Sequence, residues 1–234
     1  MSGPAAIEAR GLARRFGPVV ALHPLDLDVP AGRVLAVVGA NGAGKSTLIR
    51  LLAGLGRPTA GHVTIGGAGG DRRARRARVG LVAHATLLYP ALTARENLVF
   101  AGRLYGVADP AARAGELLGA FELDPVADRA VGTFSRGTAQ RVAIARALVH
   151  DPAVLLLDEP FTGLDVRAAE LLERLVDGLR GRHTVVLSSH DLPRAARLAN
   201  QGLALAAGRG RALDAATLAD PEALAAACGV EARP

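Results

Sequence analysis

The chain has 234 residues, of which 50% are apolar and 3% aromatic, and its formal net charge is +6. This length and composition allow one large hydrophobic core, and no apolar run reaches the roughly 18 to 20 residues that a membrane-spanning helix needs. The basic surplus lacks the aromatic stacking platforms that nucleic-acid binding would use, so we expect no nucleic-acid partner. A single cysteine, Cys228, excludes an internal disulfide and favours a reducing compartment.

The first part of the chain, residues 5–32, alternates apolar and polar residues in two stretches. A period of two is typical of half-buried strands, so we predict an antiparallel strand pair here. Continuous apolar runs then occur at 33–39, 78–84, 153–160, 184–190 and 202–208. Runs without polar alternation predict strands buried on both faces, as in a parallel sheet.

Helical patterns separate these runs. Residues 46–53 carry leucines at helical spacing and precede Gly54, and residues 88–150 are mostly helical with breaks at prolines. Strand–helix alternation predicts an α/β fold with a mostly parallel sheet, an N-terminal antiparallel β subdomain and a helical subdomain at about 88–150. With no internal repeat, we expect a single domain over 1–234.

Three charged segments, at 71–80, 177–183 and 208–214, predict connections on the surface. The first of them, DRRARRARVG, holds five arginines within eight positions. We interpret that run as a solvated connecting segment.

The motif G-x-x-x-x-G-K-S occurs once, at Gly39–Ser46, between a predicted strand and a predicted helix. Its glycines let backbone N–H groups face phosphates, and the helix start adds positive potential. Among the 28 lysine and arginine residues only Lys45 is a lysine, as a compact charge between β- and γ-phosphates requires. We expect ATP here, with the Ser46 hydroxyl on Mg²⁺. The expected nucleotide contacts are Gly39, Asn41, Gly42, Ala43, Gly44, Lys45, Ser46 and Thr47.

The apolar run VLLL ends in two acids, Asp158 and Glu159. Two carboxylates at the end of a buried strand are costly unless they bind a cation or exchange a proton. We expect Asp158 to hold Mg²⁺, usually through water, and Glu159 to polarise the attacking water. The alternative is a pair of surface acids beyond a core strand.

A third signal is the segment 134–148, in which Ser135 and Gly137 stand where a helix begins. Backbone N–H groups at a helix start can receive a phosphate. Ser135 is equally a good N-cap, so from the residues alone this can also be a capped helix and nothing more.

Taken together, these motifs resemble the ATP-binding subunit of an ABC (ATP-binding-cassette) transporter, and the resemblance covers nearly the whole chain. The residues that carry it, in family order, are Phe16, the loop 39–46, the segment 135–140, Asp158-Glu159, the TGLD ending at Asp165, and His190. The resemblance implies a P-loop NTPase (RecA-like) fold and an ATPase that uses ATP and Mg²⁺.

The resemblance also implies residue roles. Phe16 would stack on adenine, and His190 would contact the γ-phosphate and orient the water. Ser135 and Gly137 would contact the γ-phosphate held by the opposite subunit, because such sites form head-to-tail between two subunits. Asp165 would link the two sites across that interface.

The resemblance further implies two partners, an integral membrane permease and a second ATP-binding subunit in a homodimer or heterodimer. The chain would then be cytoplasmic and peripheral on the inner face of the cell membrane. The amino-acid sequences of segments 134–165 and 84–107 resemble those of the ATPase of the bacterial haem exporter of cytochrome c maturation. This resemblance implies haem export. Alternatives are an ABC-2-type drug or other small-molecule exporter ATPase, or a soluble or regulatory ABC ATPase with weakened hydrolysis.

Two departures from the family pattern stand out. A family glutamine follows the strand after the arginine run, whereas the matching position here is His84, or Ala85 if the register shifts by one. An imidazole can bond to water or phosphate, and a methyl group cannot. In addition, Arg136 stands where the family has the first glycine of Ser-Gly-Gly, and its charge faces either the incoming nucleotide or solvent.

Overall fold

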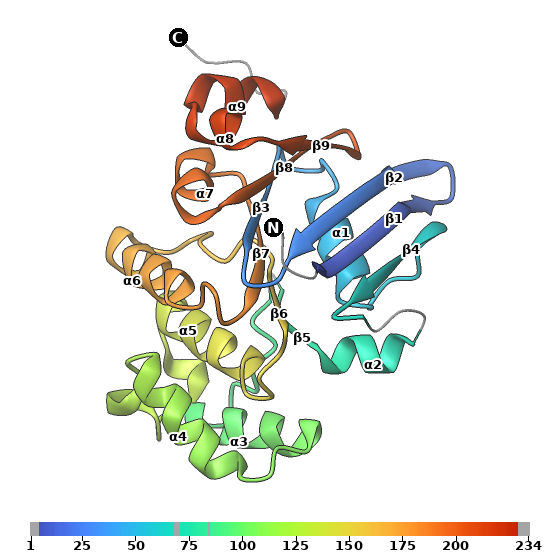
Figure 1. The fold of residues 1–234 in the computed structure, drawn as a ribbon. Coiled ribbons are helices and arrows are strands. Elements are labelled where there is room, and N and C mark those ends of the chain that lie inside the picture. The colour runs from blue at the N-terminus through green and yellow to red at the C-terminus, as the bar shows by residue number, and fades with distance from the viewer. Residues whose placement is uncertain (1–4, 68–70, 84, 229–234) are drawn as a thin grey trace.

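The structure is a computed structural model, and it describes residues 5–67, 71–83 and 85–228. Two sheets form within these residues (Figure 1). The smaller sheet has the order β2-β1-β4, with β1 antiparallel to both neighbours. Its strands are β1 (Ala5–Phe16), β2 (Val19–Pro30) and β4 (Ala60–Ile65). The predicted antiparallel pair is confirmed, and β4 adds a third strand that the sequence did not indicate.

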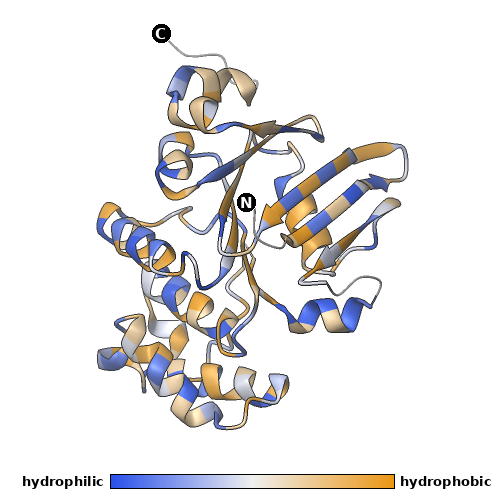
Figure 2. Ribbon diagram, viewed as in Figure 1, coloured by the Kyte–Doolittle hydropathy of each residue, from blue (hydrophilic) through white to orange (hydrophobic). Residues whose placement is uncertain are grey.

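The larger sheet has the order β5-β6-β7-β3-β8-β9, and its first five strands are parallel. They coincide with the five continuous apolar runs: β5 (Val79–Val82), β6 (Val154–Leu157), β7 (Thr184–Ser189), β3 (Val34–Val38) and β8 (Gln201–Ala206). Figure 2 shows how apolar these central strands are. The α/β class and the mostly parallel sheet are therefore confirmed.

The prediction of a surface connection over 208–214 is wrong. Residues Arg209–Leu213 form strand β9, which pairs antiparallel with β8 at the sheet edge. Only Leu213 of this strand is buried, and the arginines beside it are exposed. Its sequence therefore has no apolar alternation, because an edge strand is held by backbone hydrogen bonds to its neighbour.

The central strands are buried on both faces, as continuous apolar runs predict. On β6, Leu155 and Leu157 point into one core cluster, whereas Val154 and Leu156 point into the other. The second cluster is closed by α1 (Lys45–Leu52) and the antiparallel sheet, which lie on the same side of the large sheet in Figure 1. Both faces are covered, so the loops at the strand ends are held by packed elements.

Helices cover the opposite face and continue into the helical region. The helical region contains α3 (Ala94–Tyr105), α4 (Pro110–Ala120), the 3₁₀ turns Asp124–Val126 and Val131–Thr133, and α5 (Arg136–Ala147). The remaining helices of that face are α6 (Val166–Asp177), α7 (Leu192–Leu198), α8 (Ala215–Ala219) and α9 (Pro221–Ala227). Among the described residues, no helix is both long enough and apolar enough to cross a membrane.

The arginine run is not simply a solvated connection. Its residues Arg72–Ala77 form helix α2, and Arg75 is only 6% exposed. Arg75 donates to the carbonyl of Val63, and Arg72 donates to the carbonyl of Gly54. The two guanidinium groups thus donate to a carbonyl of strand β4 and to a carbonyl of the turn after α1, which a charge count cannot reveal.

Candidate active site

The loop between β3 and α1 has a backbone that glycine alone fits. Gly39 has φ 151° and Gly44 has φ 108°. A Cβ on Gly39 would lie 2.2 Å from the Leu205 carbonyl oxygen, and one on Gly44 would lie 2.7 Å from that of Ala21. The loop borders a cavity of about 400 Å³. The lining residues are Ala21, Asn41, Gly42, Ala43, Gly44, Lys45, Ser46, Thr47, Glu159, Thr162 and His190.

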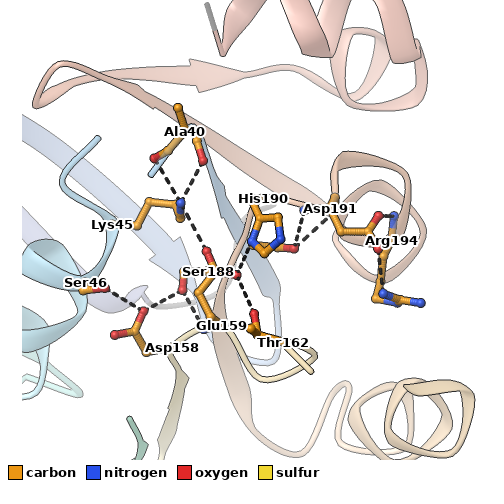
Figure 3. A network of polar contacts seen from close by, with 12 residues as sticks. Ala40, Lys45, Ser46, Asp158, Glu159, Thr162, Ser188, His190, Asp191 and Arg194 are labelled. Atoms are coloured by element: carbon orange, nitrogen blue, oxygen red, sulfur yellow. Dashed lines mark hydrogen bonds and ion pairs between the residues drawn. The ribbon is translucent and has the colours of Figure 1, made fainter. Parts of the chain in front are cut away.

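Lys45 is the buried cation of this cavity, with a side chain only 6% exposed. Its Nζ donates to the carbonyl oxygens of Gly39 at 2.7 Å and Ala40 at 3.2 Å. The same nitrogen lies 3.2 Å from Oε1 of Glu159 (Figure 3). A buried ammonium needs such partners, and the oxygens of a phosphate could replace them.

Asp158 follows directly on β6 and is 4% exposed. Its Oδ1 accepts hydrogen bonds from the hydroxyls of Ser46 at 3.1 Å and Ser188 at 2.8 Å. The structure thus brings Asp158 and Ser46, the two residues expected to hold Mg²⁺, within hydrogen-bond distance, although they are far apart in sequence. Sequence reasoning missed Ser188, because it stands at the end of an apolar run with no motif of its own.

Glu159 links Lys45 to His190. Its Oε2 lies 2.8 Å from Nδ1 of His190 and accepts a long hydrogen bond of 3.4 Å from the Thr162 hydroxyl. His190 is 55% exposed, whereas the Glu159 side chain is 16% exposed. One carboxylate thus faces a buried cation on one side and an accessible imidazole on the other, an arrangement suited to holding and moving a proton.

The position of His190 depends on the start of α7. Asp191 caps that helix by accepting from the Arg194 backbone N–H, and it pairs with the Arg194 guanidinium at 2.6 Å. Arg194 also pairs with Glu173 of α6 at 2.6 Å. These contacts tie the loop that carries His190 to two helices.

The other predicted residues line no part of this cavity among the described residues. Phe16 is 53% exposed, and the Arg14 guanidinium lies 4.4 Å from its ring centre. Ser135 caps α5 by accepting from the Thr138 N–H, and Asp165 caps α6. A Cβ on Gly137 would lie 2.7 Å from the Cβ of Ala168 on α6, so the two helix starts are packed together.

Of the residues at the two departures from the family pattern, Ala85 and Arg136 are described, and neither lines the cavity. His84 falls outside the described residues, and Ala85 is an exposed residue between β5 and α3. The Arg136 guanidinium packs against Gly163, because a Cβ on Gly163 would lie 2.9 Å from the Cζ of Arg136.

The glycine loop joins the parallel strand β3 to helix α1 and holds the buried Lys45, and the two acids follow β6, which is separated from β3 by β7. This arrangement defines a P-loop nucleotide-binding protein. The family model described as ABC transporter matches residues 22–162. Nod factor export ATP-binding protein I of Burkholderia lata is 40% identical over 210 residues, which are 88% of this chain and 69% of that protein. Aliphatic sulfonates import ATP-binding protein SsuB 1 of Mesorhizobium japonicum is 39% identical over 216 residues, which are 89% of this chain and 78% of that protein.

A solved structure agrees with these relatives. The dimeric post-hydrolysis state of the ATP-binding cassette MJ0796 bound to ADP and Pi has a TM-score of 0.81 at 28% identity, covering 89% of this chain and 98% of that chain. The chain therefore belongs to the ABC transporter family, as an ATP-binding and ATP-hydrolysing domain.

Proposed function

We propose that this chain binds ATP with Mg²⁺ beside the glycine loop and hydrolyses it with Glu159 as general base, to drive a membrane permease. The observation that carries this proposal is the meeting of Lys45, Glu159 and His190 at one cavity. The remaining steps follow from the contacts of these residues.

ATP binding exchanges the partners of Lys45. The backbone N–H groups of 39–44 and the start of α1 bind the phosphates, and Lys45 moves from its carbonyl and carboxylate partners to the β- and γ-phosphate oxygens. Glu159 is released from the ammonium by the same movement. Phe16 provides an exposed ring on which adenine stacks.

The residues present fit Mg²⁺. The Ser46 hydroxyl and Asp158 Oδ1 are 3.1 Å apart, and both are hard oxygen ligands. No group of three acidic, histidine or cysteine side chains among the described residues could form a protein-only cage, which suits an ion that keeps water and phosphate ligands. Bound Mg²⁺ would neutralise charge on the β- and γ-phosphate oxygens.

Glu159 then acts on water. Its carboxylate takes a proton from the water as the water oxygen bonds to the γ-phosphorus, and the bond from that phosphorus to the bridging oxygen breaks, so ADP leaves with the electron pair. His190, bonded to Glu159 Oε2, holds the carboxylate and the water in line and contacts the γ-phosphate. Lys45 stabilises the charge on the phosphoryl oxygens.

We propose that Ser135, Gly137 and Asp165 complete the site of a second copy. Ser135 and Gly137 lie at the start of α5 and contact the γ-phosphate that the opposite subunit binds, and Asp165 at the start of α6 connects the two sites. Support comes from the relative MJ0796, whose described state is a dimer bound to ADP and Pi.

In this proposal, ATP hydrolysis drives transport through the permease, so the chain needs a surface that contacts the permease. A hollow beside β5 is lined by the exposed apolar side chains of Leu55, Leu87 and Tyr105, together with the basic side chains of Arg76, Arg146 and His150. Exposed apolar side chains gathered at one hollow support an interaction site there. We propose that the permease contacts this region and holds the chain on the cytoplasmic face of the membrane.

We propose that the permease is an exporter, with haem as the first cargo to test. The resemblance of 134–165 to the haem exporter ATPase supports haem, and the Nod factor export relative supports outward transport. A sulfonate import relative of similar identity shows that overall identity does not separate the two directions. The Nod factor relative also favours a second candidate, export of another small molecule.

The test is purification of the tagged chain from its own cells, followed by ATPase assays of the complex in lipid discs. We expect an integral membrane protein to copurify and ATP turnover to rise with the cargo. Stimulation by haem supports haem export, and stimulation only by other compounds supports the second candidate. Turnover that is absent both with and without the permease would instead support the regulatory ATPase with weakened hydrolysis.

A further inference from the structure

The hydroxyl of Ser188 sits between the two acids of the site. Ser188 is 0% exposed, and its hydroxyl donates to Asp158 Oδ1 at 2.8 Å. The same oxygen accepts the backbone N–H of Glu159, also at 2.8 Å. A serine hydroxyl has one proton to donate, so these two bonds fix the direction of that proton. Figure 3 shows Ser188 between Asp158 and Glu159.

The sheet register explains how Ser188 comes to this place. Strand β7 lies between β3, which leads into the glycine loop, and β6, which leads into the acids. Ser188 pairs with Val37 of β3, and the preceding Leu187 pairs with Leu157, the last residue of β6. A side chain here can therefore reach both acids, although they are about 30 residues away in sequence.

The backbone of Glu159 needs such a partner. Glu159 has φ 53°, in the left-handed region that residues other than glycine rarely adopt. This conformation persists only where surrounding bonds hold it. The Ser188 hydroxyl holds the N–H of Glu159, and the Glu159 carbonyl accepts from the Thr162 N–H at 3.2 Å.

The same hydroxyl also orients Asp158. Ser188 and Ser46 both donate to Oδ1, and no hydrogen bond from the described residues reaches Oδ2. The carboxylate is thereby held in one rotation, with Oδ2 left to a water or a cation.

We propose that Ser188 is a positioning residue for ATP hydrolysis, which holds the Asp158 carboxylate and the Glu159 backbone in one fixed relation. The inference rests on the proposed roles of those two acids. Ser188 does not line the cavity, so it acts through the two acids. Partners of this kind around metal and catalytic groups commonly change metal affinity or activity by roughly 10- to 100-fold when they are lost.

The test compares Ser188→Ala with Ser188→Thr, which keeps the hydroxyl. For Ser188→Ala we expect kcat to fall by about 10-fold or more with a much smaller change in KM for ATP. Ser188→Thr should recover most of that loss. Ser188→Cys, of similar size but with weaker hydrogen bonds, answers the same question if the alanine variant does not fold.

A binding measurement gives a readout separate from turnover. The affinity for a nonhydrolysable ATP analogue is measured by calorimetry with and without Mg²⁺, and Ser188→Ala should reduce the gain that Mg²⁺ provides. The matched control is Thr184→Val on the same strand. Thr184 is 1% exposed and its hydroxyl accepts from the Gly32 N–H, so this variant loses a similar buried bond outside the site.

The outcomes separate the inference from the proposed function. Glu159→Gln and Asp158→Asn are assayed together with the serine variants. If both acid variants are inactive while Ser188→Ala keeps the parent kcat and Mg²⁺ response, the inference is wrong and the proposed function stands. If the acid variants hydrolyse ATP at the parent rate, the proposed function fails first. A kcat loss in Thr184→Val equal to that in Ser188→Ala would show a purely structural role.

Discussion

Two regions of the molecule carry the predicted functional residues, and they differ in how much one chain completes. Around the glycine loop, Lys45, Glu159 and His190 are joined by contacts of 3.2 Å and 2.8 Å at one cavity. At the starts of α5 and α6, Ser135 and Asp165 cap their own helices and do not line that cavity. The first region is therefore assembled when one chain folds, whereas Ser135 and Asp165 of the second have side-chain bonds only to their own helices among the described residues.

The largest effect is expected at the first region. Lys45→Ala should lower ATP hydrolysis by about 100-fold or more, because it removes the charge that meets the developing phosphoryl charge. Lys45→Arg should be nearly as inactive, since the planar fork of a guanidinium does not fit a buried site built for a compact ammonium. Steady-state ATPase rates measure both, with Arg73→Lys at an exposed position of α2 as the control. Parent activity in Lys45→Arg would contradict the shape argument.

The second prediction concerns Glu159→Gln. This variant should lose hydrolysis and trap a stable ATP-bound dimer, because it removes the base. It should also bind ATP more tightly as a monomer, since ATP no longer has to displace a carboxylate from Lys45. Gel filtration measures the dimer and calorimetry the affinity, and Glu170→Gln at an exposed position of α6 makes the same charge change as a control. Hydrolysis at the parent rate would overturn the assigned base.

The third prediction joins the two regions. Gly137→Ala pushes a Cβ to 2.7 Å from that of Ala168, so it should disturb the start of α5 without touching the cavity. Gly137→Ala and Lys45→Ala should each be inactive alone. A mixture should regain part of the activity, because a head-to-tail dimer of the two contains one site with both halves intact. A mixture as inactive as its components would argue against sites shared between subunits.

The smallest effect is expected at His150, outside both regions. His150 stacks on Tyr105 with ring centres 3.7 Å apart, and burial lowers its pKa from 6.5 to about 4. Between these values the unfolded chain binds more protons than the folded one, so stability falls as pH falls through that window. Thermal unfolding at pH 7 and pH 5 should show a smaller drop in His150→Gln than in the parent. His62→Gln, at an exposed position, should drop as the parent does.

Much of the fold was predictable because local patterns carry it. The buried parallel strands have continuous apolar runs, and the glycine loop requires backbone conformations that glycine adopts. The exceptions have long-range causes. Strand β9 depends on pairing with β8, and the buried Arg75 donates to the carbonyl of Val63, a residue of β4. Neither partner is visible in the neighbouring residues.

The amino-acid sequence by itself determined the class of the fold, the phosphate loop and the two acids, because those features are short and impose their own backbone demands. The tertiary structure alone decided which side chains meet at the site. Ser188 and Thr162 join Glu159 only through the order of the parallel strands and the turn after β6. Hydrogen bonds between distant strands depend on register, and register is a property of the whole packed sheet.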